Sequence, residues 1–427
     1  MRSVKMDQTF RMLMACTLLS ACSTASSESV SGGKLPTGPD AGDMDLSPFY
    51  RWTDALPAEL GGLLREEPIA KQEEMGSAAE AHRILYTSTD VRWHSGPVPV
   101  SGTLYLPNGP PPAGGWPLVA WGHGTLGIAD VCAPSWTGFK SRDASYMNRW
   151  LQAGFAVVAT DYQGLGGPGP HPYLDWRVAG RSVLDSVRAA LALKSGLISN
   201  QVLITGQSQG ASSALGAVRL SREYAPELNI LGMVATGLNS TFSNGPISLP
   251  ARDSTNMFLS FASGGVRDNG PKIEDVVSSK GKQLLDKSRQ ACTKEIGMLA
   301  RELKVGSLAE TLAIPMDQFA SMRLPVTDMP MEKIDVPLMI ATGLADDTVT
   351  PILQYAAASA LCASGNSVTW LTYPGMDHDD AMHGSFEDSV TFARTLLAGE
   401  KVSPNCSQIS EPGPPEDIES DSASDDE

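Results

Sequence analysis

The sequence predicts an α/β protein whose mostly parallel central sheet is flanked by helices. From residue 117 onward, short apolar runs typical of buried strands alternate with segments in which apolar residues recur at helical spacing. In addition, the pentapeptide Gly206-Gln207-Ser208-Gln209-Gly210 joins one of these runs to an alanine-rich helical segment. Both observations indicate repeated strand–helix–strand units.

The composition indicates a globular protein with a sizeable core. Hydrophobic residues make up 42% of the 427 residues, and the mean hydropathy is -0.11. The net charge of -16 argues against a basic face that would bind nucleic acid. A chain of this length is expected to form one large domain with an insertion, or two domains.

The N-terminus resembles a bacterial export signal. Three basic residues within the first 11 precede an apolar stretch at 12–19. This stretch ends in Leu19-Ser20-Ala21-Cys22, which resembles a lipobox, so residues 1–22 are expected to be a lipoprotein signal peptide with Cys22 as the lipidated residue. The resemblance implies a lipoprotein anchored to the outer membrane, facing the periplasm or the cell surface. The alternative is a secretory signal with an incidental cysteine.

Two terminal segments have too few apolar residues to fold. Residues 23–45 are rich in Ser, Gly and Pro and are expected to form a flexible tether. Residues 407–427 are expected to form a disordered acidic tail, because eight acidic side chains fall in the last 17 residues. No run of 18 apolar residues follows the signal, so no later membrane span is expected.

Strands and helices are predicted between these ends. Residues 81–106 are expected to form antiparallel strands. The runs expected to form parallel strands are 117–121, 155–160, 202–205, 230–235, 337–341 and 368–373. An apolar stripe over 183–191 predicts a helix between two of them. Ser385, with Asp388 three residues later, is expected to cap the last helix.

One interval is too long for a simple crossover. Residues 241–331 separate two predicted core strands and are expected to be a mainly helical cap, inserted into a core formed by 46–240 and 332–406. A long helix is predicted at 280–303. Four methionines of this segment are expected to line a ligand pocket, or alternatively to pack the insert's own core: Met316, Met322, Met329 and Met331. A second domain unrelated to the active site is the other possibility.

The pentapeptide around Ser208 fits the G-x-S-x-G nucleophile elbow. Glycines on both sides let the backbone close up at a sharp strand-to-helix turn, and the helix N-terminus favours developing negative charge. The context therefore predicts an α/β-hydrolase fold with Ser208 as nucleophile. A glycine-rich turn with an idle serine is the alternative.

A serine nucleophile needs a base and an acid, which follow it in this fold in the order acid, then histidine. Only His378 and His383 lie C-terminal to Ser208. His378 is favoured as the base because its loop follows the last predicted strand, and His383 is expected to be a surface or helix-cap residue. Asp346, in the loop after strand 337–341, is the predicted acid, with Asp347 as the alternative.

Backbone N–H groups are needed to stabilise the oxyanion. One is expected from Gln209 and the other from Thr125, in the loop Gly122-His123-Gly124-Thr125, where His123 is expected to be structural. A metal site is not expected, because His378 lies alone among adjacent acids without ligand spacing. Ester cleavage through an acyl-enzyme needs no cofactor.

Four cysteines remain after the predicted signal, an even number that favours disulfides in an exported protein. They are Cys132, Cys292, Cys362 and Cys406, and three pairings are possible.

Three segments together resemble the secretory lipase family over roughly residues 68–406. They are the loop 122–125, the stretch 161–174 and the pentapeptide at Ser208. The resemblance implies a helical cap that shields the acyl pocket, and hydrolysis of acyl esters that include lipids. It also implies the pairing of Cys132 with Cys292 and of Cys362 with Cys406. A bacterial lipoprotein member is expected to act on short or unusual esters rather than on triacylglycerol.

The sequence therefore predicts a serine ester hydrolase, either a lipase or a carboxylesterase. Its expected partners are a lipid or small acyl ester as substrate and, through Cys22, the membrane. One alternative is a serine peptidase of the prolyl-oligopeptidase kind, although the chain lacks the repeats of a propeller. The other is a non-catalytic binding protein on a hydrolase scaffold.

Overall fold

A computed structural model describes residues 32–242, 254–265, 272–321, 328–330 and 332–416. The predicted signal peptide with Cys22 lies outside these residues, as do Met322, Met331 and the end of the predicted tail. The described residues belong to one compact unit.

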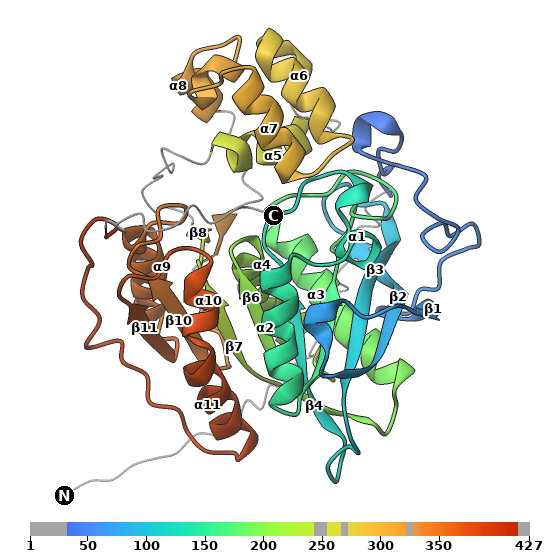
Figure 1. The fold of residues 1–427 in the computed structure, drawn as a ribbon, viewed down its shortest axis with the longest axis vertical. Coiled ribbons are helices and arrows are strands. Elements are labelled where there is room, and N and C mark those ends of the chain that lie inside the picture. The colour runs from blue at the N-terminus through green and yellow to red at the C-terminus, as the bar shows by residue number, and fades with distance from the viewer. Residues whose placement is uncertain (1–31, 243–253, 266–271, 322–327, 331, 417–427) are drawn as a thin grey trace, which may run out of the picture. The chain divides into compact units, whose positions relative to one another are not determined.

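A nine-stranded sheet forms the centre of the described chain (Figure 1). Its spatial order is β1 (Leu63–Pro68), β2 (Ala78–Asp90), β3 (Gly96–Pro107), β5 (Ala156–Thr160), β4 (Trp116–Gly122), β6 (Ile198–Gln207), β7 (Ile230–Thr236), β10 (Leu338–Gly343) and β11 (Val368–Tyr373). The first four strands pair antiparallel, and every pair from β5 to β11 is parallel. The α/β fold and each predicted strand are confirmed.

Helices cover both faces of the sheet. On one face, α3 (Trp176–Leu193), α4 (Gln209–Tyr224) and α9 (Pro351–Ala363) share an apolar cluster with the strands. On the other face, α2 (Ser141–Gln152) and α11 (Phe386–Leu397) do the same. The predicted stripe explains why α3 packs, because Val183, Leu184 and Val187 are completely buried. The carboxyl ends of the parallel strands are thereby held at one edge of a rigid layer.

Ser385 directly precedes the last helix as predicted, but its side chain does not cap that helix. A short helix, α10 (Asp380–Gly384), runs almost directly into α11, and Ser385 between them has φ -84° and ψ 1°. Its hydroxyl donates back to the carbonyl of Met382 at 3.3 Å rather than accepting from the start of α11. The sequence pattern could not reveal that another helix precedes this serine.

The insert begins and ends at adjacent positions. Strand β8 (Thr241–Phe242) pairs in parallel with β9 (Asp328–Met329). Between them lie the helices α5 (Ser254–Gly265), α6 (Ser279–Ser288), α7 (Thr293–Glu302) and α8 (Met316–Ser321) (Figure 1). The insert is thus mainly helical in its described part.

The single helix predicted at 280–303 is two helices. Chain direction changes at Cys292, whose backbone N–H donates to the Glu295 side chain at 3.2 Å and so caps α7. Cys292 is also bonded to Cys132 near α1 (Pro134–Thr137). Apolar spacing alone continues across this break, which is why the sequence prediction missed it.

The insert has its own apolar core. Its members include Phe258, Phe261, Leu285 and Ile296, and two residues from core loops join them, Ile128 and Tyr173. Met316 packs against this cluster, and Met329 is buried in the main cluster beside the sheet. For these two methionines the structure favours packing over the lining of a pocket.

The N-terminal segment is attached to the core over its described part. The N–H of Gly33 donates to the carbonyl of His94 at 2.8 Å, and that of Gly169 donates to Asp43 Oδ1 at 2.8 Å. Next to it, Met44 N–H donates to Asp130 Oδ2 at 2.8 Å. The expectation of a flexible tether up to residue 45 is therefore wrong from residue 32 onward.

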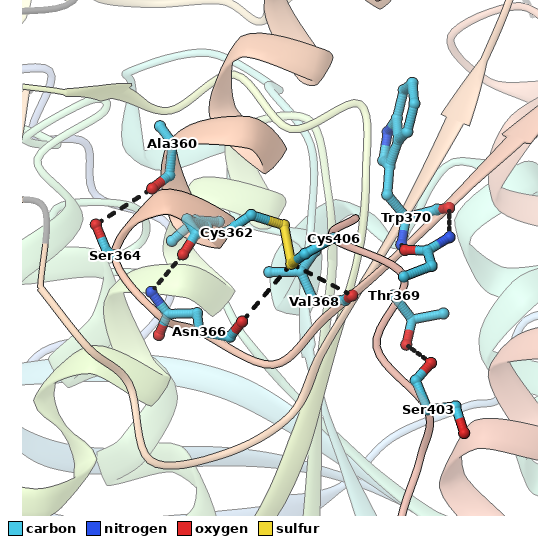
Figure 2. Close-up of a disulfide and its surroundings, with 11 residues drawn as sticks. Ala360, Cys362, Ser364, Asn366, Val368, Thr369, Trp370, Ser403 and Cys406 are labelled. Atoms are coloured by element: carbon cyan, nitrogen blue, oxygen red, sulfur yellow. Dashed lines mark hydrogen bonds between the residues drawn. A yellow bond between two sulfur atoms is a disulfide. The ribbon is translucent and has the colours of Figure 1, made fainter. Parts of the chain in front are cut away.

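The segment after α11 also returns to the core. Figure 2 shows the disulfide that joins Cys406 to Cys362 at the end of α9. Asn405 next to it accepts from Trp370 N–H and donates to Trp370 O, both at 2.8 Å. Farther on, Glu416 N–H donates to the carbonyl of Leu344 at 2.8 Å. Residues 407–416 are thus held in place, contrary to the predicted disorder there.

Both disulfides have the pairing that the family resemblance implied. Cys132–Cys292 and Cys362–Cys406 each have Cα atoms 5.5 Å apart. The first links a core loop to the insert, and the second links α9 to the C-terminal segment. Among the described helices, none combines the length and apolar character needed to cross a bilayer.

Candidate active site

Ser208 lies on a sharp turn between β6 and α4. Its backbone has φ 57° and ψ -120°, a conformation that costs free energy for any residue with a Cβ. A Cβ on Gly206 would collide with the carbonyl of Gly210, and one on Gly210 would collide with that of Gly122. The sequence therefore has glycine on both sides of a strained serine, the geometry of a nucleophile elbow.

His378 lies beside this turn, in the loop after β11. Ser208 N–H donates to the carbonyl of Thr236 at 2.9 Å, and the next residue, Gly237, faces the imidazole. A Cβ at position 237 would come within 2.7 Å of His378 Cε1. In addition, Gln207 Nε2 donates to the carbonyl of His378 at 3.2 Å. Glycine at 237 therefore leaves room for the imidazole next to the elbow.

Asp346 holds the other side of this imidazole. His378 Nδ1 donates to Asp346 Oδ2 at 2.8 Å, and the carboxylate is buried. Its Oδ1 accepts the N–H groups of Thr348 and Val349 at 3.0 and 2.8 Å. Gln354 Nε2 also donates to Oδ2, at 2.9 Å. Four donors therefore fix the orientation of this carboxylate.

The two alternative residues occupy different surroundings. Asp347 is exposed, whereas Asp346 is completely buried. His383 lies in the last turn of α10, where its ring donates from Nε2 to the carbonyl of Arg142 at 3.1 Å and contacts the edge of Tyr146. Burial lowers the pKa of His383, although the bond to Arg142 opposes this. The structure thus brings Ser208, His378 and Asp346 together from three loops.

The loop after β4 approaches the elbow from the opposite side. Gly210, the second residue of α4, packs directly against Gly122. The loop residue His123 is completely buried, its Nδ1 donates to the carbonyl of Gly124 at 2.7 Å, and burial lowers its pKa. Thr125 Oγ1 is hydrogen-bonded to the hydroxyl of Tyr173 at 2.8 Å. These contacts suit the structural role expected of His123.

One residue near the elbow escaped the sequence analysis. His171 is buried, and its Nε2 lies 2.8 Å from Gln209 Nε2 while Nδ1 lies 2.9 Å from the carbonyl of Gln163. Burial lowers its pKa to about 3, so the ring is neutral at ordinary pH. It belongs to the stretch 161–174 that carried the family resemblance, but no pattern there indicates what it contacts.

The described part of the chain was predicted to hold no metal site at the acids beside His378. His, Cys, Asp and Glu side chains do not gather there in threes to ligate a metal. The acids beside His378 form a turn, in which Asp377 Oδ1 accepts the N–H groups of Asp379 and Asp380. A serine on a strained turn next to an imidazole–carboxylate pair can perform nucleophilic acyl transfer without such a group.

Comparison with known proteins indicates the family to which this chain is similar. The model of the family described as secretory lipase matches residues 135–379, more than half of the chain. A secreted triacylglycerol lipase of Malassezia furfur is 28% identical over 284 residues, which cover 62% of this chain and 56% of that protein. A secreted triacylglycerol lipase of Malassezia globosa is 25% identical over 389 residues, 85% of this chain and 83% of that protein.

The fold is similar to that of a solved structure. Candida antarctica lipase A in its closed state superposes with a TM-score of 0.66 at 18% sequence identity. The superposition covers 86% of this chain and 89% of the other. At this level of identity the likeness concerns the arrangement of strands and helices.

Proposed function

The chain belongs to the secretory lipase family and is a carboxylic ester hydrolase, and we propose that it cleaves acyl esters through Ser208, His378 and Asp346. The observation that carries this proposal is the hydrogen bond from His378 Nδ1 to buried Asp346 Oδ2 beside the strained serine. The bond holds the imidazole with its Nε2 available as a base.

The proposed reaction has two halves. In the first, His378 Nε2 takes the proton of the Ser208 hydroxyl as its oxygen attacks the ester carbonyl, and the same proton is then given to the leaving alcohol. In the second, His378 activates water, which attacks the acyl-enzyme and releases the carboxylic acid and free serine. Throughout, the charge of Asp346 stabilises the imidazolium.

Negative charge on the tetrahedral oxygen also needs stabilisation. We assign this role to the backbone N–H groups of Gln209 and Thr125. Gln209 is the first residue of α4, where the helix dipole favours an anion, and Thr125 lies in the loop packed against that helix.

The substrate class follows from the family. The relatives are named as triacylglycerol lipases, which supports lipid esters as substrates. We also propose that the insert, residues 241–331, is a cap that shields the acyl pocket, with residues 46–240 and 332–406 as the catalytic core. Helix α5 contacts Tyr173, and His171 two residues earlier contacts the Gln209 side chain, which supports this assignment.

The decisive experiment uses a fluorophosphonate probe and p-nitrophenyl esters. The wild-type protein should hydrolyse the esters and become labelled on Ser208, whereas Ser208→Ala should do neither while keeping its unfolding transition. Aminoacyl anilides in parallel would reveal a peptidase if they were the better substrates. A folded protein that is not labelled and hydrolyses neither substrate would instead be the non-catalytic binding protein, and the proposal would be wrong.

We also propose that the protein is exported and anchored by a lipid on Cys22. The relatives are named as secreted, and two disulfides suit an oxidising compartment. Expressed in a Gram-negative host, the chain should incorporate labelled palmitate and fractionate with the outer membrane. A Cys22→Ala variant should lose the label. Unlabelled protein in the medium would mean an ordinary secretory signal.

A further inference from the structure

A serine of the insert is buried at the junction with the core. Ser263 of α5 is completely buried, and its hydroxyl donates to the carbonyl of His171. The same oxygen accepts the N–H of Tyr173 at 3.2 Å. From the core side, Arg92 donates to Ser263 Oγ and to its carbonyl at 3.3 and 3.1 Å. Helix α5 is thereby fixed to the segment 171–173 by hydrogen bonds in addition to apolar packing.

The same segment reaches both residues that would stabilise the oxyanion. The ring of His171 is bonded to the side chain of Gln209 at 2.8 Å. The hydroxyl of Tyr173 is bonded to that of Thr125 at 2.8 Å. The bond between His171 and Gln209 is buried and shielded from water, and that between Tyr173 and Thr125 is partly buried. One short segment therefore bridges the insert to Gln209 and to Thr125.

The direction of the His171 contact is settled by its other ring nitrogen. Nδ1 faces the carbonyl of Gln163, which can only accept, so Nδ1 carries the proton. Nε2 is then an acceptor, and the Gln209 amide must donate to it. Burial lowers the pKa of His171 and keeps its ring neutral, so Gln209 remains the donor and His171 the acceptor over the working pH range.

We propose that His171 and Tyr173 are positioning residues. They hold Gln209 and Thr125 so that the backbone N–H groups of these two residues converge on the oxyanion. Ser263 of the insert fixes the position of the segment that carries His171 and Tyr173. Stabilisation of the oxyanion falls steeply when a donor is displaced, so side-chain contacts that lock two donor residues have a direct effect on the rate. The proposal rests on the proposed function, since it concerns the same site.

The test separates positioning from mere packing. Tyr173→Phe keeps the ring in the insert's apolar cluster and removes only the hydroxyl that contacts Thr125. We expect kcat for a short p-nitrophenyl ester to fall by about 10-fold or more, a part of the ~10²- to 10³-fold loss seen when an oxyanion donor is removed. KM should stay within about twofold. Affinity for a trifluoromethyl ketone, which forms the tetrahedral oxyanion, should fall in parallel with kcat.

Two further variants complete the experiment. Ser263→Ala should lower kcat in the same way, and combining it with Tyr173→Phe should cost less than the product of the two effects, because both act on one unit. Tyr224→Phe is the matched control. Its hydroxyl, at the far end of α4, donates to Asp185 at 2.8 Å, and its loss should leave kcat unchanged.

The outcomes are distinct. A Tyr173→Phe protein with wild-type kcat and ketone affinity, or with a change in KM alone, would overturn the positioning role. Equal losses in Tyr173→Phe and Tyr224→Phe would also overturn it, since they would reflect general destabilisation. If wild-type Ser208 is not labelled by the phosphonate, the proposed function itself fails, and the positioning role fails with it. If Ser208 is labelled and the Tyr173→Phe protein behaves like the wild type, only the positioning role fails.

Discussion

Gln354 donates a hydrogen bond to Asp346 Oδ2, the same oxygen that accepts from the imidazole beside Ser208. Gln354 lies in α9 and is completely buried. Its Oε1 accepts from Thr342 Oγ1 at 3.0 Å, and that hydroxyl in turn accepts from Trp370 Nε1 at 2.9 Å. The amide therefore has one orientation, and the carboxylate is held through a chain of bonds that begins in β11.

Replacing this amide should weaken catalysis and stability together. Gln354→Met keeps the volume but removes the donor to Asp346, so we expect kcat to fall by about 10-fold. We also expect the free energy of unfolding to fall by about 1–3 kcal/mol, because buried partners lose their hydrogen bonds. Ester hydrolysis and urea denaturation measure the two effects. Gln283→Met, on an exposed turn of α6, is the control, and a Gln354→Met enzyme indistinguishable from it would contradict this expectation.

The two histidines should differ sharply in their effect on rate. His378→Ala should reduce kcat by roughly 10⁴- to 10⁶-fold, about as much as Ser208→Ala, because members of such a unit are not additive. His383→Ala removes a bond to the carbonyl of Arg142 and a ring contact with Tyr146, neither of which involves Ser208, so kcat should change less than about threefold. Single-turnover kinetics with a p-nitrophenyl ester measure both. The reverse ranking would show that the base is misassigned.

The two adjacent aspartates offer a matched pair. Asp346→Asn keeps the shape but removes the charge that stabilises the imidazolium, and kcat should drop by roughly 10⁴-fold. Asp347→Asn changes an exposed side chain and should leave kcat within about twofold. Steady-state hydrolysis of the same ester by the two proteins provides the comparison. Similar losses in both would argue that Asp346 is not the acid.

Stability should depend on pH through Asp130. Burial raises the pKa of its carboxyl from 3.8 to about 8, and the nearby carboxyl of Asp43 adds to this, its own pKa also being raised by burial. The native state keeps this proton up to about pH 8, whereas the unfolded chain loses it near pH 4. The contribution to stability is therefore complete below pH 4 and is lost as the pH rises to 8, at roughly 1.4 kcal/mol per unit of pKa difference.

Asp130→Asn should flatten this dependence, because the amide resembles the protonated acid and does not titrate. Thermal unfolding followed by circular dichroism from pH 4 to 9 would show it. Relative to the wild type, the variant should gain several degrees in Tm towards pH 8 and gain nothing at pH 4. Parallel curves would mean that Asp130 does not exchange its proton in this range.

The local patterns predicted much of the fold and the site. Alternating apolar runs located the parallel strands, and the glycines around Ser208 located the elbow, because both depend on residues close in sequence. The order of motifs along the chain left His378 and His383 as candidate bases, and the loop after the last predicted strand favoured His378. What the sequence could not predict depends on distant contacts. The break at Cys292 is fixed by its bond to Cys132, and Gln354 meets Asp346 only through the packing of α9 on the sheet.

Glu416, the last described residue, is fastened by hydrogen bonds to the two loops that carry Asp346 and His378. Glu416 binds the carbonyl of Leu344 through its N–H and the N–H of Gly375 through its carboxylate, at 2.8 and 2.7 Å. Leu344 precedes Asp346 by two residues, and Gly375 precedes His378 by three. A protease that trimmed the chain between Cys406 and Glu416 would leave the disulfide intact yet remove this fastening. Purified enzyme should therefore be checked for C-terminal clipping by intact-mass measurement before its activity is compared between preparations.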